Sequence, residues 1–197
     1  MKKLLFALVL CVLFSVPSFA EDQASAKPGM DPAAMEKMKA ATSPNDNHKA
    51  LDPFIGNWTY TAKFWMPGSE KAEESSGTSS AEWIYGGRFI KDTVKGTWMG
   101  QPFEGTGFTG YNNVRGEYES VWLDSGMTGI CFSKGSFDAA TKTFKYSGVV
   151  SCPLTGEKEV PCRSETVWAD NDHYTITSWG TVKGEEHKGM ELSFTRA

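Results

Sequence analysis

From Gly56 onward, apolar and polar residues alternate along the chain with a period of two. This alternation is typical of β-strands that bury one face and expose the other to water. In the first strand the apolar positions are Trp58, Tyr60, Ala62, Phe64 and Met66. Further segments of this kind predict strands at 78–85, 88–95, 103–111, 117–124, 128–136, 142–151, 160–169, 173–182 and 188–196.

Short turn signals separate these segments, and no helical period lies between them. Gly86-Gly87 and Asn112-Asn113 are typical of tight turns, because Gly and Asn tolerate the backbone angles that such turns need. Strands joined by tight turns pair with their chain neighbours in antiparallel fashion. An open sheet of this length would leave edges that invite aggregation. The pattern therefore predicts an all-β, antiparallel up-and-down barrel of about eight to ten strands.

Residues 1–20 have the features of a secretory signal peptide. Lys2 and Lys3 precede an apolar run over 4–16, and Ala20 offers a small residue for cleavage. The run is too short to cross a bilayer as a helix. We therefore expect export, with the bacterial periplasm as the destination, and no membrane span in the mature protein.

The chain after the signal segment divides into an N-terminal extension and one domain. Residues 21–47 are predicted to form a polar tether and a short helix, which Asp31 and Pro32 begin. A second helical turn is expected over 48–55, at the start of a barrel domain that spans 48–197. A domain of this size buries a substantial core.

Charge excludes one class of partner. The chain carries 20 Lys and Arg residues against 24 Asp and Glu residues, and no basic cluster follows the signal segment. Because binding to nucleic acid depends on clustered cations, we expect no nucleic-acid partner. The sequence does not indicate an oligomeric state.

Gly56, Trp58 and Arg196 bear on how the barrel closes. In a closed barrel the first and last strands are neighbours, so Arg196 is expected to lie across the indole of Trp58 as a cation–π contact. Gly56 would let the backbone turn tightly beneath that contact. This arrangement resembles the lipocalin and wider calycin signature, in which a G-x-W and a late Arg have these roles.

A longer resemblance covers most of residues 48–196. Its motifs are Ile55-Gly56-x-Trp58, Gly86-Gly87-Arg88-Phe89, Met99-Gly100-Gln101-Pro102-Phe103-Glu104-Gly105, Gly110-Tyr111-Asn112, Trp122-x-Asp124-Ser125 and Asp138-Ala139-Ala140-Thr141-Lys142. In this order they resemble a bacterial family known as domain of unknown function 1579. The resemblance implies a calycin-like barrel, and it brings no established reaction or ligand.

Three cysteines follow the signal segment and are not part of that family pattern. Cys152 and Cys162 flank a turn-rich segment, and an oxidising compartment predicts a disulfide between them. Closing so short a loop would stabilise the domain by about 2–3 kcal/mol. Cys131 is then expected to be a small, buried thiol.

Gly105, Gly107 and Gly110 match the G-x-G-x-x-G pattern of dinucleotide-binding folds. Such folds need a helix that begins within the motif, and no helical period follows here. We interpret these glycines as positions in a barrel strand where neighbouring groups crowd the backbone.

The aromatic residues are more numerous than a small barrel needs to fill its interior. A barrel of this size is either filled by side chains or holds one small ligand. The leading hypothesis is a binding module for a small apolar ligand in the barrel interior. The candidate lining residues are Tyr60, Phe64, Trp83, Phe103, Tyr118 and Trp122.

Other functions stay open. Asp124 or Glu82 could act as the base of a small enzyme if burial raised the pKa of its carboxyl. A packed barrel could instead bind a protein through loops near Gln101 and Asn112. No metal or cofactor is predicted, and haem held by His48 is the alternative among three scattered histidines.

Overall fold

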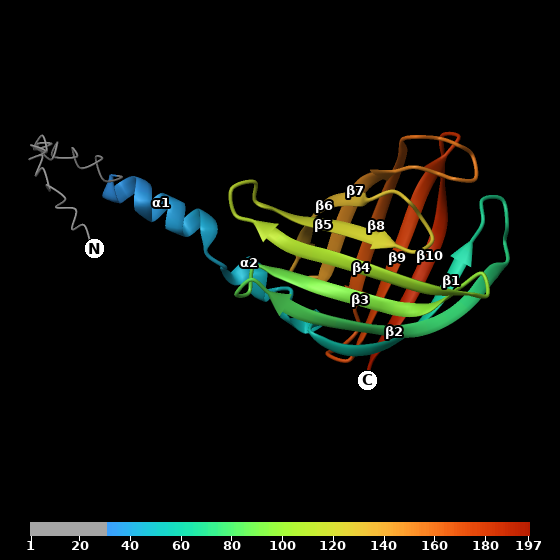
Figure 1. The fold of residues 1–197 in the computed structure, drawn as a ribbon, viewed down its shortest axis with the longest axis horizontal. Helices are drawn as coiled ribbons and strands as arrows, with labels where there is room; N and C mark the ends of the chain where they lie inside the picture. Colours follow the sequence, from blue (N-terminus) through green and yellow to red (C-terminus); the bar gives the residue numbers. More distant parts are fainter. Residues whose placement is uncertain (1–30) are drawn as a thin grey trace, which may run out of the picture.

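Residues 31–197 are described by the computed structural model, and the predicted signal peptide and most of the tether lie outside the described residues. Helix α1 (Pro32–Thr42) begins with Pro32 in its first turn and has no buried residue. It lies away from the rest of the molecule (Figure 1). The side-chain amide of Asn113 donates to the carbonyl of Ser43 at 2.8 Å and to two carbonyls of α1, so it ties the end of the helix to the turn after β4.

Two short helical segments close one end of the barrel. Helix α2 (Asp46–Lys49) and the 3-10 turn η1 (Asp52–Phe54) together replace the single turn expected over 48–55. Between them Leu51 is fully buried against Ile90, Tyr118 and Phe144. Since a fully buried side chain excludes water from this end, we call it the closed end.

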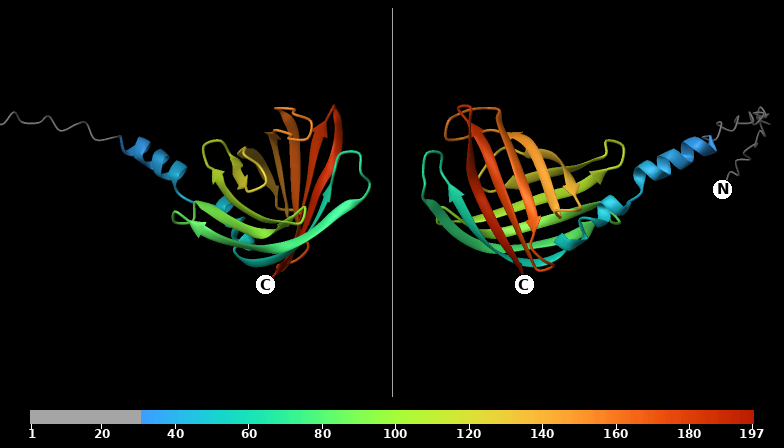
Figure 2. Two further views of the ribbon diagram at one scale, coloured as in Figure 1. Left: turned by 45° about the vertical axis from the view of Figure 1, so that its right-hand side comes forward. Right: turned by 180° about the vertical axis from the view of Figure 1, so that it is seen from behind.

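The ten strands form one closed antiparallel barrel, as the alternation predicted. Each strand pairs with its chain neighbours, and the first strand pairs with the last (Figure 2). The strands are β1 (Gly56–Trp65), β2 (Ala72–Ile84), β3 (Phe89–Trp98), β4 (Gln101–Asn112), β5 (Glu117–Asp124), β6 (Cys131–Asp138), β7 (Thr143–Val150), β8 (Val160–Trp168), β9 (His173–Val182) and β10 (Glu185–Arg196). Within residues 31–197, no helix has the length and apolar character needed to cross a membrane.

The seam between β1 and β10 is fixed by Trp58 and Arg196, which are direct partners across the two strands. The Arg196 guanidinium lies over the indole, 4.1 Å from the ring centroid. Gly56 has a φ of +126°, and a Cβ there would lie 3.0 Å from Nη1 of Arg196. A larger residue at position 56 would therefore strain the backbone and crowd the guanidinium.

The register decides which side chains face the interior, because directly paired residues project to the same side of a sheet. Aromatic rings gather inside, nearer the closed end. The principal cluster consists of Trp58, Tyr60, Ala62, Val94, Trp168, Tyr174 and Phe194.

Candidate functional site

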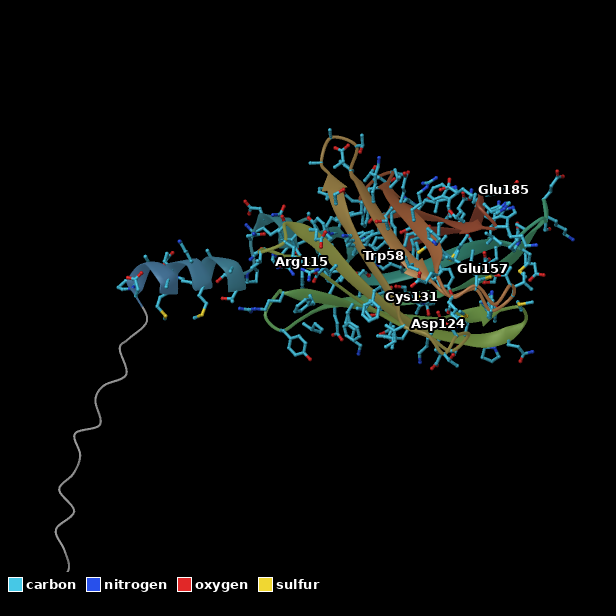
Figure 3. All side chains as sticks on the ribbon, turned by 90° about the horizontal axis from the view of Figure 1, so that it is seen from above. Trp58, Arg115, Asp124, Cys131, Glu157 and Glu185 are labelled. Atoms are coloured by element: carbon cyan, nitrogen blue, oxygen red, sulfur yellow. The ribbon has the colours of Figure 1, made fainter. Side chains whose placement is uncertain are left out.

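The barrel interior changes from tightly packed to solvent-accessible along its axis. Trp58 and Phe144, near the closed end, are each only 1 % exposed. Inward-facing residues farther along the strands are only partly buried although they pack on the same core. These are Phe64, Phe103, Trp122, Ile176 and Leu192. Solvent thus reaches the interior from the second end, which we call the open end; in Figure 3, Asp124, Glu157 and Glu185 mark it and Arg115 lies at the opposite end.

A cleft between two hairpins adds to this opening. Strand β2 pairs with β1 as far as Ala72, but its pairing with β3 stops at Gly77 and Gly96. Beyond these glycines the β1–β2 and β3–β4 hairpins separate and leave a cleft of about 1050 Å³. The Oγ atom of Ser75 lines this region and is buried without a hydrogen-bond partner among residues 31–197. An unpartnered buried hydroxyl is a group that a bound molecule could satisfy.

Trp122 lies flat against the inner wall because strand β4 carries glycines beneath it. A Cβ at Gly107 would lie 3.2 Å from the ring, and one at Gly105 would collide with it. The indole Nε1 donates to Asp124 Oδ2 at 2.7 Å, which fixes the ring orientation. Gly105 and Gly107 therefore leave room for the Trp122 ring, which agrees with the prediction that neighbouring groups crowd the backbone of this strand.

Asp92 is a carboxylate that lies deep inside the barrel. It is opposite Ala81 and Gly107, both buried, so its side chain faces inward. Ser79 Oγ donates to Asp92 Oδ1 at 2.5 Å. Burial raises the pKa of the Asp92 carboxyl, and its charge adds to the burial that raises the pKa of Tyr60. Within residues 31–197 no Lys, Arg or His side chain lies within 4.0 Å of this carboxylate.

Neutralising Asp92 is expected to stabilise the protein at neutral pH. The raised pKa means that the folded state binds the proton more readily than the unfolded state does. The stabilisation from that proton is complete below the unfolded pKa near 3.8 and is lost as the pH rises through the folded pKa. We expect Asp92→Asn, which still accepts from Ser79, to raise the unfolding free energy by about 1–2 kcal/mol at pH 7.

Urea denaturation at several pH values measures this effect. The advantage of Asp92→Asn should shrink steadily between pH 7 and about pH 4. Glu82→Gln is the matched control, since Glu82 is exposed on the outer face of β2. An asparagine variant that is less stable at pH 7, or an advantage independent of pH, would contradict the assignment.

The structure divides the six predicted lining residues between two levels. Tyr60, Phe64, Phe103 and Trp122 belong to or pack on the principal cluster. Trp83 and Tyr118 contact the closed end instead. Trp83 donates to Asp52 Oδ1 at 3.0 Å, and Tyr118 donates to the carbonyl of Asn47 at 2.8 Å. Their polar atoms are therefore engaged in fixing the closed end.

The two carboxylates singled out in the sequence differ in position. Glu82 lies outside the barrel, where it pairs across the strands with Lys91. Asp124 faces inward at the open end, but its oxygens accept from Trp122 and from the backbone of Gly126 at 2.8 Å. Sequence reasoning missed Asp92. Its alternation with the apolar residues Ile90 and Val94 was the signal that could have found it.

His48 is buried in the closed end. Its Nδ1 accepts from the backbone N–H of Asn45 at 3.1 Å, and its ring packs edge-on against Tyr111. Burial lowers the pKa of His48, and the nearby Arg88 lowers it further. Within residues 31–197 no group of three or more His, Cys, Asp and Glu side chains is arranged to hold a metal ion. The haem alternative at His48 stays an untested prediction.

The three cysteines are free thiols in this structure. Cys162 pairs with Gly148 on β7, and Cys152 follows the end of that strand. Burial raises the pKa of Cys131 and Cys162, whereas hydrogen bonds from Thr155 lower the pKa of Cys152. The structure does not show the predicted bridge between Cys152 and Cys162, which stays a prediction.

Comparison with known proteins agrees with this architecture. The family described as "Protein of unknown function (DUF1579)" matches residues 43–196. The crystal structure of Rv2717c from M. tuberculosis is 14 % identical, with a TM-score of 0.57 over 79 % of this chain and 99 % of that chain. At this identity the likeness shows the fold alone.

Two redesigned β-barrels are more distant. Each is 13 % identical over 75 % of this chain, with a TM-score of 0.37; the match covers 95 % of one design and 98 % of the other, mFAP1, which is bound to DFHBI. No curated protein matches the chain.

Proposed function

The chain belongs to the DUF1579 family of proteins of unknown function, and we propose that it binds one small, largely apolar molecule inside its barrel. The observation that carries the proposal is the set of half-buried apolar side chains that face inward toward the open end. A filled barrel would bury these side chains completely, because protein interiors are close-packed. A ligand of matching shape would complete their burial.

Space inside the wall supports the proposal. Gly180 on β9 pairs with Cys162 and His187, and a Cβ there would meet only Val160, at 3.9 Å. A side chain at this position would therefore extend into free volume near the open end. The cleft between the two hairpins would serve as an entrance, and this volume would give an apolar molecule space inside the barrel.

A pair of variants on one strand tests the proposal. Gly180→Leu is expected to fill the interior, whereas Thr181→Leu adds the same side chain to the outer face of β9. The neutral probe N-phenyl-1-naphthylamine should fluoresce strongly with the native protein and with Thr181→Leu. We expect Gly180→Leu to weaken its binding by at least about fivefold.

A native protein that does not enhance the probe, or a Gly180→Leu variant that binds it as tightly as Thr181→Leu, would refute an interior site. Thermal unfolding of both variants shows whether each is folded. Native mass spectrometry of the protein isolated from a bacterial periplasm would add an independent readout, since a retained ligand adds mass that disappears on denaturation. The periplasm is the compartment proposed on the basis of the signal peptide predicted over 1–20.

A further inference from the structure

The charged side chains that the strands turn inward are almost all acidic. Register places on that face one arginine, one histidine and four acids: Arg196 and His187, with Glu73, Asp92, Asp124 and Glu185. Arg196 is fully engaged at the closed end, where its guanidinium donates to Asp172 and to the carbonyls of Pro53, Ile55 and Asn171 at 2.9–3.0 Å. The strands therefore supply no free lysine or arginine to the interior, and His187 Nε2 lies 3.9 Å from Glu185 Oε2.

Asp92 is the deepest of these acids and has an incomplete set of partners. Ser79 gives it one side-chain hydrogen bond, and the backbone of Thr93 gives another. A buried carboxylate without a counter-ion costs free energy, and a cation beside it removes much of that cost. Residues 31–197 provide no cation within 4.0 Å of the Asp92 carboxylate. A bound ligand could supply that cation.

Aromatic side chains share the barrel interior with this carboxylate. Asp92, Gly107 and Trp122 form one row across β3, β4 and β5, and the indole lies over the bare backbone of Gly107 and Gly105. Tyr60 and Tyr174 also lie close enough for the Asp92 charge to act on their hydroxyls. Ring faces attract cations, most strongly when the cation is shielded from water.

We propose that the ligand is an apolar organic cation, with a protonated amine held between the Asp92 carboxylate and the face of Trp122. Its apolar body would extend toward the open end and pack on Phe64 and Leu192. This inference rests on the proposed function and deepens it. A neutral molecule would leave Asp92 without a counter-ion, and an anion would be repelled by it.

Three probes with one carbon skeleton test the charge preference: 4-phenylbutylamine, 4-phenylbutanol and 4-phenylbutyrate. Each is titrated against the complex of the protein with N-phenyl-1-naphthylamine, and displacement gives its relative affinity. We expect the amine to bind at least about tenfold more tightly than the alcohol at pH 7.5, and the acid to bind least. Lowering the pH toward 4 should reduce amine binding and leave the alcohol unchanged, because Asp92 takes up a proton.

Asp92→Asn separates charge recognition from shape. This variant should bind the amine and the alcohol with equal affinity, while Glu82→Gln keeps the native preference. A native protein that binds the amine no better than the alcohol, or an Asp92→Asn variant that keeps the amine preference, overturns the inference. If N-phenyl-1-naphthylamine itself does not bind, the proposed function fails instead, so the two failures are distinguishable.

Discussion

Trp58→Ala is expected to lower the free energy of unfolding by about 3–5 kcal/mol. Trp58 is 1 % exposed and lies at the start of β1. Its ring packs against Tyr174 and Trp168, with centroids 4.9 and 5.8 Å apart. Truncation would remove these contacts and leave a cavity that neighbouring rings cannot easily fill.

The indole also has a polar role. Its Nε1 donates to the carbonyl of Phe54 at 2.8 Å, which joins β1 to the 3-10 turn at the closed end. Trp58→Phe should keep part of the packing and lose this bond, so its destabilisation should lie between those of the native protein and Trp58→Ala. The phenylalanine variant preserves the test if the alanine variant does not fold.

Urea denaturation followed by circular dichroism measures both variants. Trp65→Ala is the control on the same strand, because Trp65 faces outward, where the Nζ atom of Lys188 lies 4.7 Å from its ring centroid. Its cost should stay below about 1 kcal/mol. Equal costs at positions 58 and 65 would show that the closed end does not depend on Trp58.

Arg196→Lys is expected to cost about 2–4 kcal/mol although it keeps the charge. The guanidinium reaches two carbonyls of the segment before β1, and two oxygens of the β8–β9 turn, while it covers the Trp58 ring. An ammonium group cannot hold this planar set of acceptors while it covers the Trp58 ring, so several of these oxygens would lose their donor.

The control for this variant is Arg115→Lys, whose guanidinium is largely exposed and forms only surface ion pairs. That substitution should change the free energy of unfolding by less than about 0.5 kcal/mol. The midpoint and slope of urea denaturation give the free energy of unfolding of both variants. If Arg196→Lys changed the free energy of unfolding no more than Arg115→Lys, the hydrogen bonds of Arg196 would not contribute to stability.

Most of the barrel could be predicted from alternation and turn residues. The predicted bounds of β5 and β9 agree with the structure at both ends. Strand β2 begins six residues earlier than predicted, because 72–77 contains only one apolar residue, Ala72. That segment lies in the hairpin that separates from β3, where neither face needs a continuous apolar pattern.

The candidate site was less accessible to sequence reasoning. The large number of aromatic residues predicted an aromatic-lined interior. Asp92, however, stands between the polar residues Lys91 and Thr93 and is easily taken for a surface residue. Its direction depends on the pairing of β3 with β4, and its importance depends on which cations lie nearby. Both are properties of three-dimensional neighbours that spacing along one chain does not encode.

Pairing between β1 and β10 also has a consequence for how the barrel folds. Trp58 and Arg196 are direct partners, yet they lie 138 positions apart in the chain. Contacts of such long range slow folding, because the entropy of loop closure must be overcome before they form. Until β10 has been made, β1 keeps one edge of unpaired backbone groups exposed, and such an edge can pair with other chains. We therefore expect the unfinished barrel to be prone to aggregation for as long as β1 lacks its partner β10.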